Sequence, residues 1–194
     1  LANKNTLQRY YDIIDYRRNF LDSVGSKYYI VVVPVKTTIY PEFLPLHRQI
    51  SGQKTLTDQF VDLTDTMVGV TIVDLRPVLK DAKGGVRMFH KTDNHWNEYG
   101  SYIAYEEIMK TISLDFPGLD PIGISEYNID SVEVDGMTLS NMMGIYLGVS
   151  ENLITCKPSF NTKSRKGQLS NYSIPPSFGY KSEYEMVYVT NNDS

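Results

Sequence analysis

The sequence predicts an open, doubly wound α/β fold with a mainly parallel sheet, and two kinds of segment indicate it. Amphipathic stretches with apolar residues three or four positions apart alternate along the chain with short, continuous apolar runs. The first pattern is typical of helices that lie on a sheet, and the second is typical of parallel strands buried on both faces. Their alternation favours helices packed around one sheet.

The first helix and strand are expected near the N-terminus. Residues 6–24 carry an apolar stripe that runs from Leu7 to Leu21 beside a charged face, which predicts an amphipathic helix. Gly25 is a natural stop for that helix. The β-branched run YYIVVVPV at 28–35 then predicts a buried strand.

The next elements repeat this order. A second helix is expected at 53–68, and VTIVDL at 70–75 predicts a second buried strand. A short helix is expected at 77–83, with its proline in the first turn. Two glycines follow, and VRMF at 86–89 then predicts a short third strand.

The second half of the chain carries weaker patterns. A third long helix is expected at 97–113 with Asn97 as its N-cap. Residues 114–182 are rich in Gly, Pro, Ser and Asn, so we expect a loop-rich insertion with a few short strands or turns. The alternating YEMVYVT at 184–190 predicts a last strand. We expect residues 1–194 to belong to one domain, because this length suits one core.

Composition narrows the function classes. The net charge is −4 with scattered Lys and Arg, which argues against a nucleic-acid partner. The single cysteine, Cys156, excludes a disulfide within the chain and a zinc site built from thiolates. No apolar run reaches the ~20 residues that cross a bilayer. The 15 tyrosines suit stacking on sugar rings, although they also fill half-buried positions in ordinary domains. Because the chain begins at Leu1, we expect it to come from a longer protein.

The segment HKTDNHW at 90–96 is the strongest candidate for an active-site loop. It follows the predicted third strand, and ligands of open α/β sheets bind beyond the carboxyl ends of strands. In a local turn Asp93 reaches Nδ1–H of His95 and fixes the tautomer, which leaves Nε2 free to take a proton from a hydroxyl nucleophile. Trp96 would shield this pair from water.

Two other interpretations of this segment stay open. Asp93, His95 and His90 could supply three metal ligands, although no H-x-x-x-H or H-E-x-x-H pattern is present. Alternatively, Asp93 only caps the following turn and His95 is a packed core residue, because one D-x-H is a weak signal. Asn97 is more plausible as a helix cap than as an oxyanion donor.

Three stretches resemble the alginate O-acetyltransferase family of SGNH-hydrolase-like proteins. KTDNHWNEYGSYIAY at 91–105 resembles the family's D-x-H-W block with its Gly and Ala. VVVPVKTTIYPEFLP at 31–45 resembles its P-x-K-x-x-I-Y-P-x-x-L-P segment, and DGMTLSNMMGI at 135–145 is similar to a degraded G-D-L segment. The resemblance spans most of 7–145, and the D-x-H-W block is its most specific part.

This resemblance implies an SGNH-hydrolase-like (flavodoxin-like) fold, which the chain contains in incomplete form, and transfer of acetyl groups to polysaccharide hydroxyls through a Ser-His-Asp acyl-enzyme. Asp93 and His95 would be the catalytic Asp and His. In the family the nucleophilic Ser follows a later strand, so we expect it to lie outside this chain. Asp193-Ser194 is the alternative, although no Gly precedes it.

The resemblance also sets expectations for ligands and location. Lys36 and Tyr40 follow the first predicted strand at its carboxyl end and, with Trp96, are candidate substrate-binding residues on that ground, although Lys36 and Tyr40 also suit an ordinary loop. The partners would be a polysaccharide acceptor, an acetyl donor and, as a further candidate, a membrane-bound O-acyltransferase, with no metal and no organic cofactor. The family acts in the periplasm or at the cell surface. An SGNH-type esterase and a non-catalytic polysaccharide-binding module are the two alternatives.

Overall fold

A computed structural model describes residues 4–49, 52, 54–145, 148–160, 164–167 and 187–190. Helices and strands alternate in the first half, and a long hairpin follows in the second. The elements are α1 (Lys4–Ser23), β1 (Tyr29–Val32), α2 (Lys36–Ile39), α3 (Leu56–Thr64), β2 (Thr71–Asp74), α4 (Leu75–Asp81), α5 (Glu98–Asp115), β3 (Tyr127–Asp135), α6 (Thr138–Met142), β4 (Ser150–Pro158), β5 (Ser164–Gly167) and β6 (Val187–Thr190), with 3₁₀ turns at Pro41–Phe43, Leu46–Arg48, Ala82–Gly84 and Ile124–Glu126.

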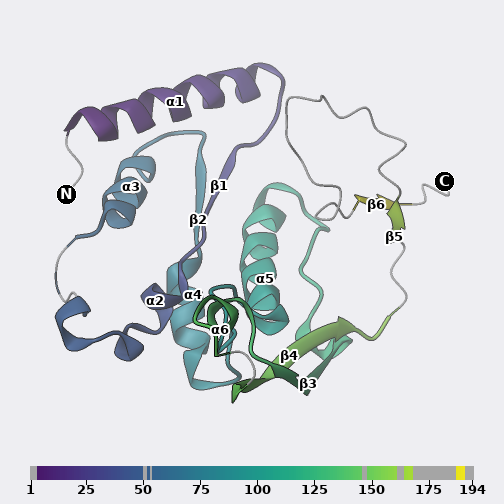
Figure 1. The fold of residues 1–194 in the computed structure, drawn as a ribbon. Helices are drawn as coiled ribbons and strands as arrows, with labels where there is room; N and C mark the ends of the chain where they lie inside the picture. The colour runs from purple at the N-terminus through teal and green to yellow at the C-terminus, as the bar shows by residue number, and fades with distance from the viewer. Residues whose placement is uncertain are drawn as a thin grey trace.

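The centre of the fold is the parallel pair β1–β2, in register from Tyr29 opposite Thr71 to Val32 opposite Asp74. Figure 1 shows this pair between α3 on one side and α5 on the other, with α1 outside α3. The rings of Tyr10 and Phe60 meet edge to face at 5.6 Å and join α1 to α3. The predicted helices and the first two predicted strands are therefore confirmed, with shorter strands than expected.

The predicted third strand at 86–89 is wrong. Phe89 forms only an isolated antiparallel bridge with Trp96, and the sheet that contains β1 has two strands in the part of the chain that the structure describes. The backbone groups of the run are taken up locally, since the carbonyl of Met88 accepts from the N–H of Asn97 at 2.8 Å. A doubly wound, mainly parallel sheet is thus not confirmed beyond this one parallel pair.

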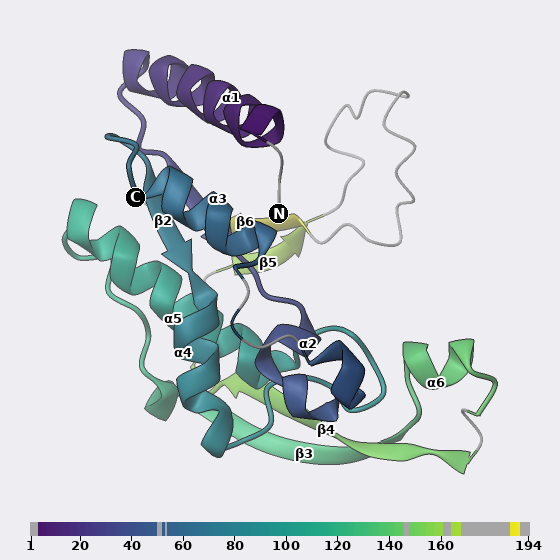
Figure 2. The same ribbon diagram turned by 90° about the vertical axis from the view of Figure 1, so that its left-hand side faces the viewer.

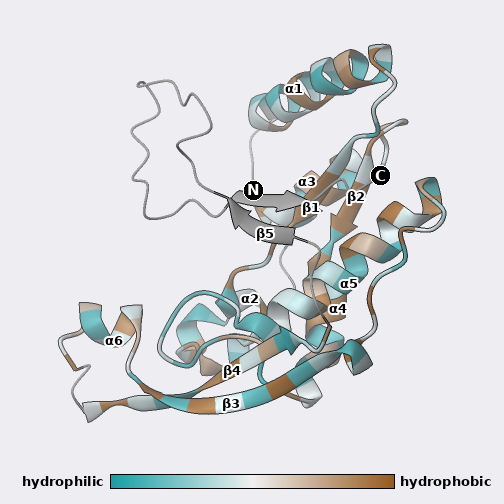
Figure 3. Cartoon of the chain, turned by 90° about the vertical axis from the view of Figure 1, so that its right-hand side faces the viewer, coloured by the Kyte–Doolittle hydropathy of each residue, from teal (hydrophilic) through white to brown (hydrophobic). Residues whose placement is uncertain are grey.

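The insertion predicted as loop-rich contains a long antiparallel hairpin instead. β3 and β4 pair over nine residues each, from Tyr127 opposite Pro158 to Asp135 opposite Ser150, and α6 lies in the connection between them. Figure 2 shows the hairpin running beneath the helices, with α6 at its far end. β3 is largely exposed and β4 is about half-buried, and Figure 3 shows a patchwork of hydrophilic and hydrophobic residues along them. Such strands lack the apolar run by which buried strands are identified.

The predicted strand at 184–190 is confirmed in part. β6 covers its last four residues and pairs antiparallel with β5, from Gly167 opposite Val187 to Ser164 opposite Thr190. Residues 184–186 and Asp193-Ser194 lie outside the described residues.

The main core lies where α2, β2, α4 and α5 meet beneath the loop at 90–96. Leu75, Leu79 and Met88 are fully buried there. Trp96 and Tyr40 pack against this cluster, so the loop rests on a rigid apolar base. Its buried members are Ile39, Val73, Leu75, Leu79, Met88, Phe89 and Ala104.

Candidate active site

The loop at 90–96 is a tight local hairpin rather than an open connection. The N–H of His90 donates to the carbonyl of His95 at 3.1 Å, and the N–H of Asn97 donates to the carbonyl of Met88. Asn97 then begins α5, because its side chain accepts from the N–H of Gly100 at 2.9 Å. The expected N-cap is confirmed, and these bonds fix both ends of the loop.

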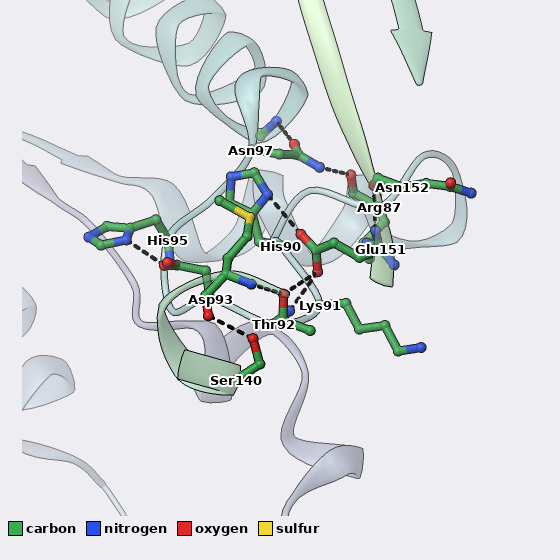
Figure 4. Close-up of polar contacts among 12 residues, drawn as sticks. Arg87, His90, Lys91, Thr92, Asp93, His95, Asn97, Ser140, Glu151 and Asn152 are labelled. Carbon is green, nitrogen blue, oxygen red and sulfur yellow. Dashed lines mark hydrogen bonds and ion pairs between the residues drawn. The ribbon is translucent and has the colours of Figure 1, made fainter. Parts of the chain in front are cut away.

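Asp93 and His95 lie side by side at the tip of this hairpin. Oδ1 of Asp93 is 2.5 Å from Nδ1 of the His95 ring, and the same oxygen accepts from the backbone N–H of His95 at 2.9 Å. The Asp93 side chain is 5% exposed and the His95 side chain is 81% exposed. Figure 4 shows the imidazole pointing away from the loop while the carboxylate stays within it. The free ring nitrogen of His95, Nε2, can therefore meet a ligand.

The carboxyl of Asp93 is held in its ionised form. Burial by itself would raise its pKa, but hydrogen bonds from the Thr138 side chain and from the backbone N–H and ring of His95 outweigh burial. Together they hold the pKa of Asp93 well below its usual range. An ionised carboxylate at Nδ1 fixes the tautomer with Nε2 as the proton acceptor.

The geometry bears on the two other interpretations of this segment, a metal site and a turn cap with a packed histidine. His95 is not a packed core residue, because its side chain is mostly exposed. Asp93 does hold the turn, through the N–H of His95, and it contacts the ring as well. For a metal site, His90 would have to face the same point, but its Nδ1 lies 3.3 Å from Oε1 of Glu151. Among the described residues no group of three His, Cys, Asp or Glu side chains could hold a metal ion.

Lys36 does not extend freely into solvent. From α2, just after β1, its ammonium donates to the carbonyls of His90, Lys91 and Asp93 at 2.6, 3.0 and 3.0 Å. Burial lowers the pKa of Lys36, an effect that neighbouring Glu151 opposes. Lys36 therefore fastens the loop to the end of β1, and its predicted contact with substrate stays a prediction.

A cleft of about 650 Å³ opens beside His95 at the carboxyl end of β1. It is bounded on one side by the chain that leaves β1 and on the other by the loop that carries His95. Trp96 forms part of the wall, whereas Tyr40 does not line this cleft, and the substrate contacts expected of both residues stay predictions. The lining residues are Val33, Pro34, Val35, Lys36, Thr37, Phe89, Asn94, His95 and Trp96.

A second cavity of about 340 Å³ shares Lys36 and Phe89 with the first. Tyr40 lies here, beside Phe43, and basic side chains complete the wall. The cavity thus places aromatic rings beside the side chains of basic residues. Its lining residues are Lys36, Tyr40, Phe43, Arg87, Phe89, His90 and Lys91.

Sequence reasoning missed Glu151, the buried carboxylate on β4. Its Oε2 accepts from the backbone N–H of Thr92 at 2.6 Å and from the Thr92 hydroxyl at 3.1 Å, directly before Asp93 (Figure 4). No local motif marks such a residue, because its main partner is a backbone amide. Ser194, the alternative nucleophile, lies outside the described residues.

In the described ranges no helix has the length and apolarity that crossing a bilayer requires.

Comparison with known proteins places these features in context. A family model described as the SGNH hydrolase-like domain of the acetyltransferase AlgX matches residues 1–146. The probable alginate O-acetylase AlgJ of Pseudomonas syringae pv. tomato is 31% identical over 100 residues, which are 52% of this chain and 25% of that protein. The AlgJ of Pseudomonas putida is 29% identical over 96 residues, 50% of this chain and 25% of that protein. The chain spans about a quarter of the length of these relatives.

Solved structures share the fold. PatB1 of Bacillus cereus, with a sulfonyl adduct, superposes with a TM-score of 0.61 at 21% identity, over 84% of this chain and 54% of that chain. The O-acetyltransferase domain of Pseudomonas putida AlgJ gives a TM-score of 0.60 at 24% identity, over 80% of this chain and 58% of that chain. The likeness therefore extends over most of this chain.

Proposed function

The chain belongs to the family of SGNH hydrolase-like domains of the acetyltransferase AlgX, and from that membership we propose that it forms the acid–base half of a polysaccharide O-acetyltransferase. The observation that carries this proposal is the pairing of a buried Asp93 carboxylate with an exposed His95 imidazole at 2.5 Å. A histidine that is only packed or only solvated does not require such a partner. A general base needs this orientation and an open Nε2.

The proposed reaction proceeds in two transfers. Nε2 of His95 takes the proton of a serine hydroxyl as its oxygen attacks the carbonyl carbon of an acetyl donor, and the resulting imidazolium returns the proton to the leaving group. A serine acetyl ester remains. His95 then takes the proton of a sugar hydroxyl, whose oxygen attacks the ester, and the proton returns to the serine. Asp93 stabilises the imidazolium in both transfers. We place the nucleophilic serine outside this chain, with Ser194 as the alternative.

The two cavities suit the reacting groups and the adjoining sugar of the acceptor. The cleft beside His95 would hold the reacting acetyl group and hydroxyl. The neighbouring cavity would hold the adjoining sugar, with Tyr40 as a stacking platform and Arg87 and Lys91 near its charge. The proposed acceptor is therefore an acidic exopolysaccharide or cell-surface polysaccharide. Trp96 would contact the substrate from the wall of the cleft.

The proposed location is outside the cytoplasm, in the periplasm or at the cell surface, with a membrane-bound O-acyltransferase as the source of acetyl groups. This part of the proposal rests on the family, because an exported polysaccharide is modified where it emerges. Fusion of the full-length protein to a reporter that is active only outside the cytoplasm tests it. Reporter activity confined to the cytoplasm would contradict the proposed location.

An acetyl-transfer assay on the full-length protein tests the function. With p-nitrophenyl acetate as donor and an acidic oligosaccharide as acceptor, mass spectrometry should detect the acetylated sugar. His95→Ala should lower the transfer rate by about 10²–10⁴-fold, because it removes the general base. His47→Ala, which changes an exposed histidine in a 3₁₀ turn, is the matched control and should retain full activity.

Deacetylation is the second candidate, and the exposure of the His95 side chain is the observation that favours it, since water can reach Nε2. The same assay separates the candidates. Acetate released at the same rate with and without acceptor indicates an esterase, and acetylated sugar indicates a transferase. Sugar binding without either product, unchanged in His95→Ala, would indicate a polysaccharide-binding module and overturn the enzymatic proposal.

A further inference from the structure

The Glu151 side chain is fully buried although it is a carboxylate. Burying an ion costs several kcal/mol unless hydrogen bonds compensate for lost hydration, and an apolar residue would fill such a position without that cost. Its Oε2 accepts two hydrogen bonds from Thr92, whereas Oε1 makes no hydrogen bond among the described residues and only faces Nδ1 of His90 at 3.3 Å. The hydrogen bonds that Glu151 accepts among the described residues therefore both come from Thr92.

Thr92 is held from two directions. On one side, Glu151 of β4 accepts hydrogen bonds from the backbone N–H and from the hydroxyl of Thr92. From the other side, the start of α6 supplies two donors: the N–H of Met137 bonds the Thr92 hydroxyl oxygen at 3.0 Å, and the N–H of Leu139 bonds the Thr92 carbonyl at 2.9 Å. Each polar group of Thr92 is therefore partnered, and the four bonds restrict the movement of its backbone.

We propose that Glu151 is a positioning residue for the Asp93–His95 pair and acts on it through Thr92. The Cα atoms of neighbouring residues are about 3.8 Å apart across a shared planar peptide, so fixing Thr92 restricts the peptide that leads into Asp93. The β3–β4 hairpin becomes part of the catalytic apparatus rather than an accessory insertion. The kinetic part of this inference rests on the proposed function, and the geometric part does not.

The hairpin has attachments that do not involve Glu151. Nη2 of Arg87 donates to the carbonyl of Asn152 at 2.8 Å, and the N–H of Cys156 donates to Glu98 at 2.7 Å. Arg87 precedes the loop at 90–96 and Glu98 follows it, so these two bonds attach β4 to the segments on either side of the loop. Removing the Glu151 carboxylate should therefore leave the hairpin docked while it releases Thr92.

Two substitutions in the full-length protein test the proposal. Glu151→Gln keeps the shape and one acceptor oxygen but removes the charge, so kcat for acetyl transfer should fall about 10-fold. Glu151→Ala should lower kcat about 10²-fold, the scale of loss from misplacing a catalytic group by about 1 Å. KM should change less than about twofold, because Glu151 lines neither cavity. Glu133→Gln, an exposed glutamate on β3, is the matched control and should change neither constant.

A second readout does not depend on catalysis. Titration of the Asp93 carboxyl by ¹³C NMR should show a low pKa in the unmodified protein and in Glu133→Gln, and a pKa closer to its ordinary value in both Glu151 variants. If the unmodified protein transfers no acetyl group, the proposed function fails, yet this titration still decides the positioning role. If Glu151→Ala does not fold, Glu151→Gln carries the test. Variants that melt earlier but keep kcat and the Asp93 titration unchanged would overturn the proposal.

Discussion

Gly100, in the first turn of α5, lies directly against the backbone carbonyl of Met88. A Cβ at position 100 would overlap the carbonyl oxygen of Met88 and would come within 3.1 Å of its Cβ. The same carbonyl accepts the N–H of Asn97 and closes the hairpin that carries Asp93 and His95. The close approach of helix and loop at this point therefore depends on the absence of a side chain.

We expect Gly100→Ala to lower the free energy of unfolding by about 1–3 kcal/mol, the usual cost of overpacking. The sign of this change in unfolding free energy is informative, because Gly→Ala inside a helix otherwise stabilises a protein by about 1 kcal/mol. Urea unfolding measures the change. Gly84→Ala is the control, since a Cβ there meets no atom within 4 Å, and it should be neutral or slightly stabilising. Stabilisation by Gly100→Ala would show that the helix can move away from Met88.

Lys36→Met tests whether Lys36 holds the loop or contacts substrate. The methionine fills the space of the lysine stem but leaves three carbonyls without their donor, so unfolding should become easier by about 1–3 kcal/mol. We expect kcat to fall more than KM rises. Lys27→Met, which removes an exposed ion pair with Asp115, should cost less than about 1 kcal/mol. A rise in KM alone, with stability unchanged, would instead support the substrate-binding interpretation.

The parts of the fold that the sequence could predict are those with local causes. The stripe along 6–24 and the apolar runs at 28–35 and 70–75 are periodic signals that need no knowledge of distant residues. The Asp93–His95 contact was predictable for the same reason, because two residues in one turn decide it. Asn97 also caps a helix through a contact only three residues along.

The parts that could not be predicted depend on distant partners. Glu151 is 59 residues from Thr92 and binds its backbone N–H, a group that every residue but proline has. β3 is largely exposed and β4 only half-buried, so neither strand carries the long apolar run of a strand buried on both faces. The run at 86–89 has strand-like residues, yet its backbone bonds go to the turn at 96–97 rather than to a neighbouring strand. The amino-acid composition of the run does not indicate which partners its backbone groups bond.

Acid should destabilise the protein partly through Asp58. Its hydrogen bonds from the backbone N–H and side chain of Thr55 and from Arg76 lower the pKa of Asp58 to about 2. A carboxyl with a depressed folded-state pKa stabilises the fold above its ordinary value, near pH 4, and loses that contribution as the pH falls through about 2. Unfolding free energies measured over this range should therefore decline on acidification.

Asp58→Asn should lower stability at neutral pH and flatten the decline between about pH 4 and 2, because the titrating group is gone. Asp62→Asn, on the same helix but 54% exposed and paired only with Lys54 at the surface, is the control and should leave the slope nearly unchanged. An unaltered acid slope in Asp58→Asn would mean that other carboxyls govern acid unfolding.

Asp93→Asn separates orientation of the His95 ring from formation of the turn. An asparagine oxygen can still accept the backbone N–H of His95, so the turn should persist and the melting temperature should change little. The same oxygen also faces Nδ1 of the ring, but a neutral amide holds the ring less firmly and stabilises the imidazolium less than a carboxylate does. The corresponding substitution in a serine protease lowers kcat about 10⁴-fold, and we expect a loss of about 10²–10⁴-fold here, because solvent partly orients an exposed ring.

The measurement is the acetyl-transfer rate of the full-length protein beside its melting temperature. Asp130→Asn, an exposed aspartate on β3, is the matched control and should alter neither value. The pH profile adds a further check, because the carboxyl of Asp93 stays ionised far below neutrality in the unmodified protein and therefore contributes no step to that profile near pH 7. If Asp93→Asn unfolds the domain while the remaining folded fraction transfers acetyl groups at the original rate, Asp93 only holds the turn. His95 would then have to act without an orienting partner, and the acid–base pairing proposed for this loop would be wrong.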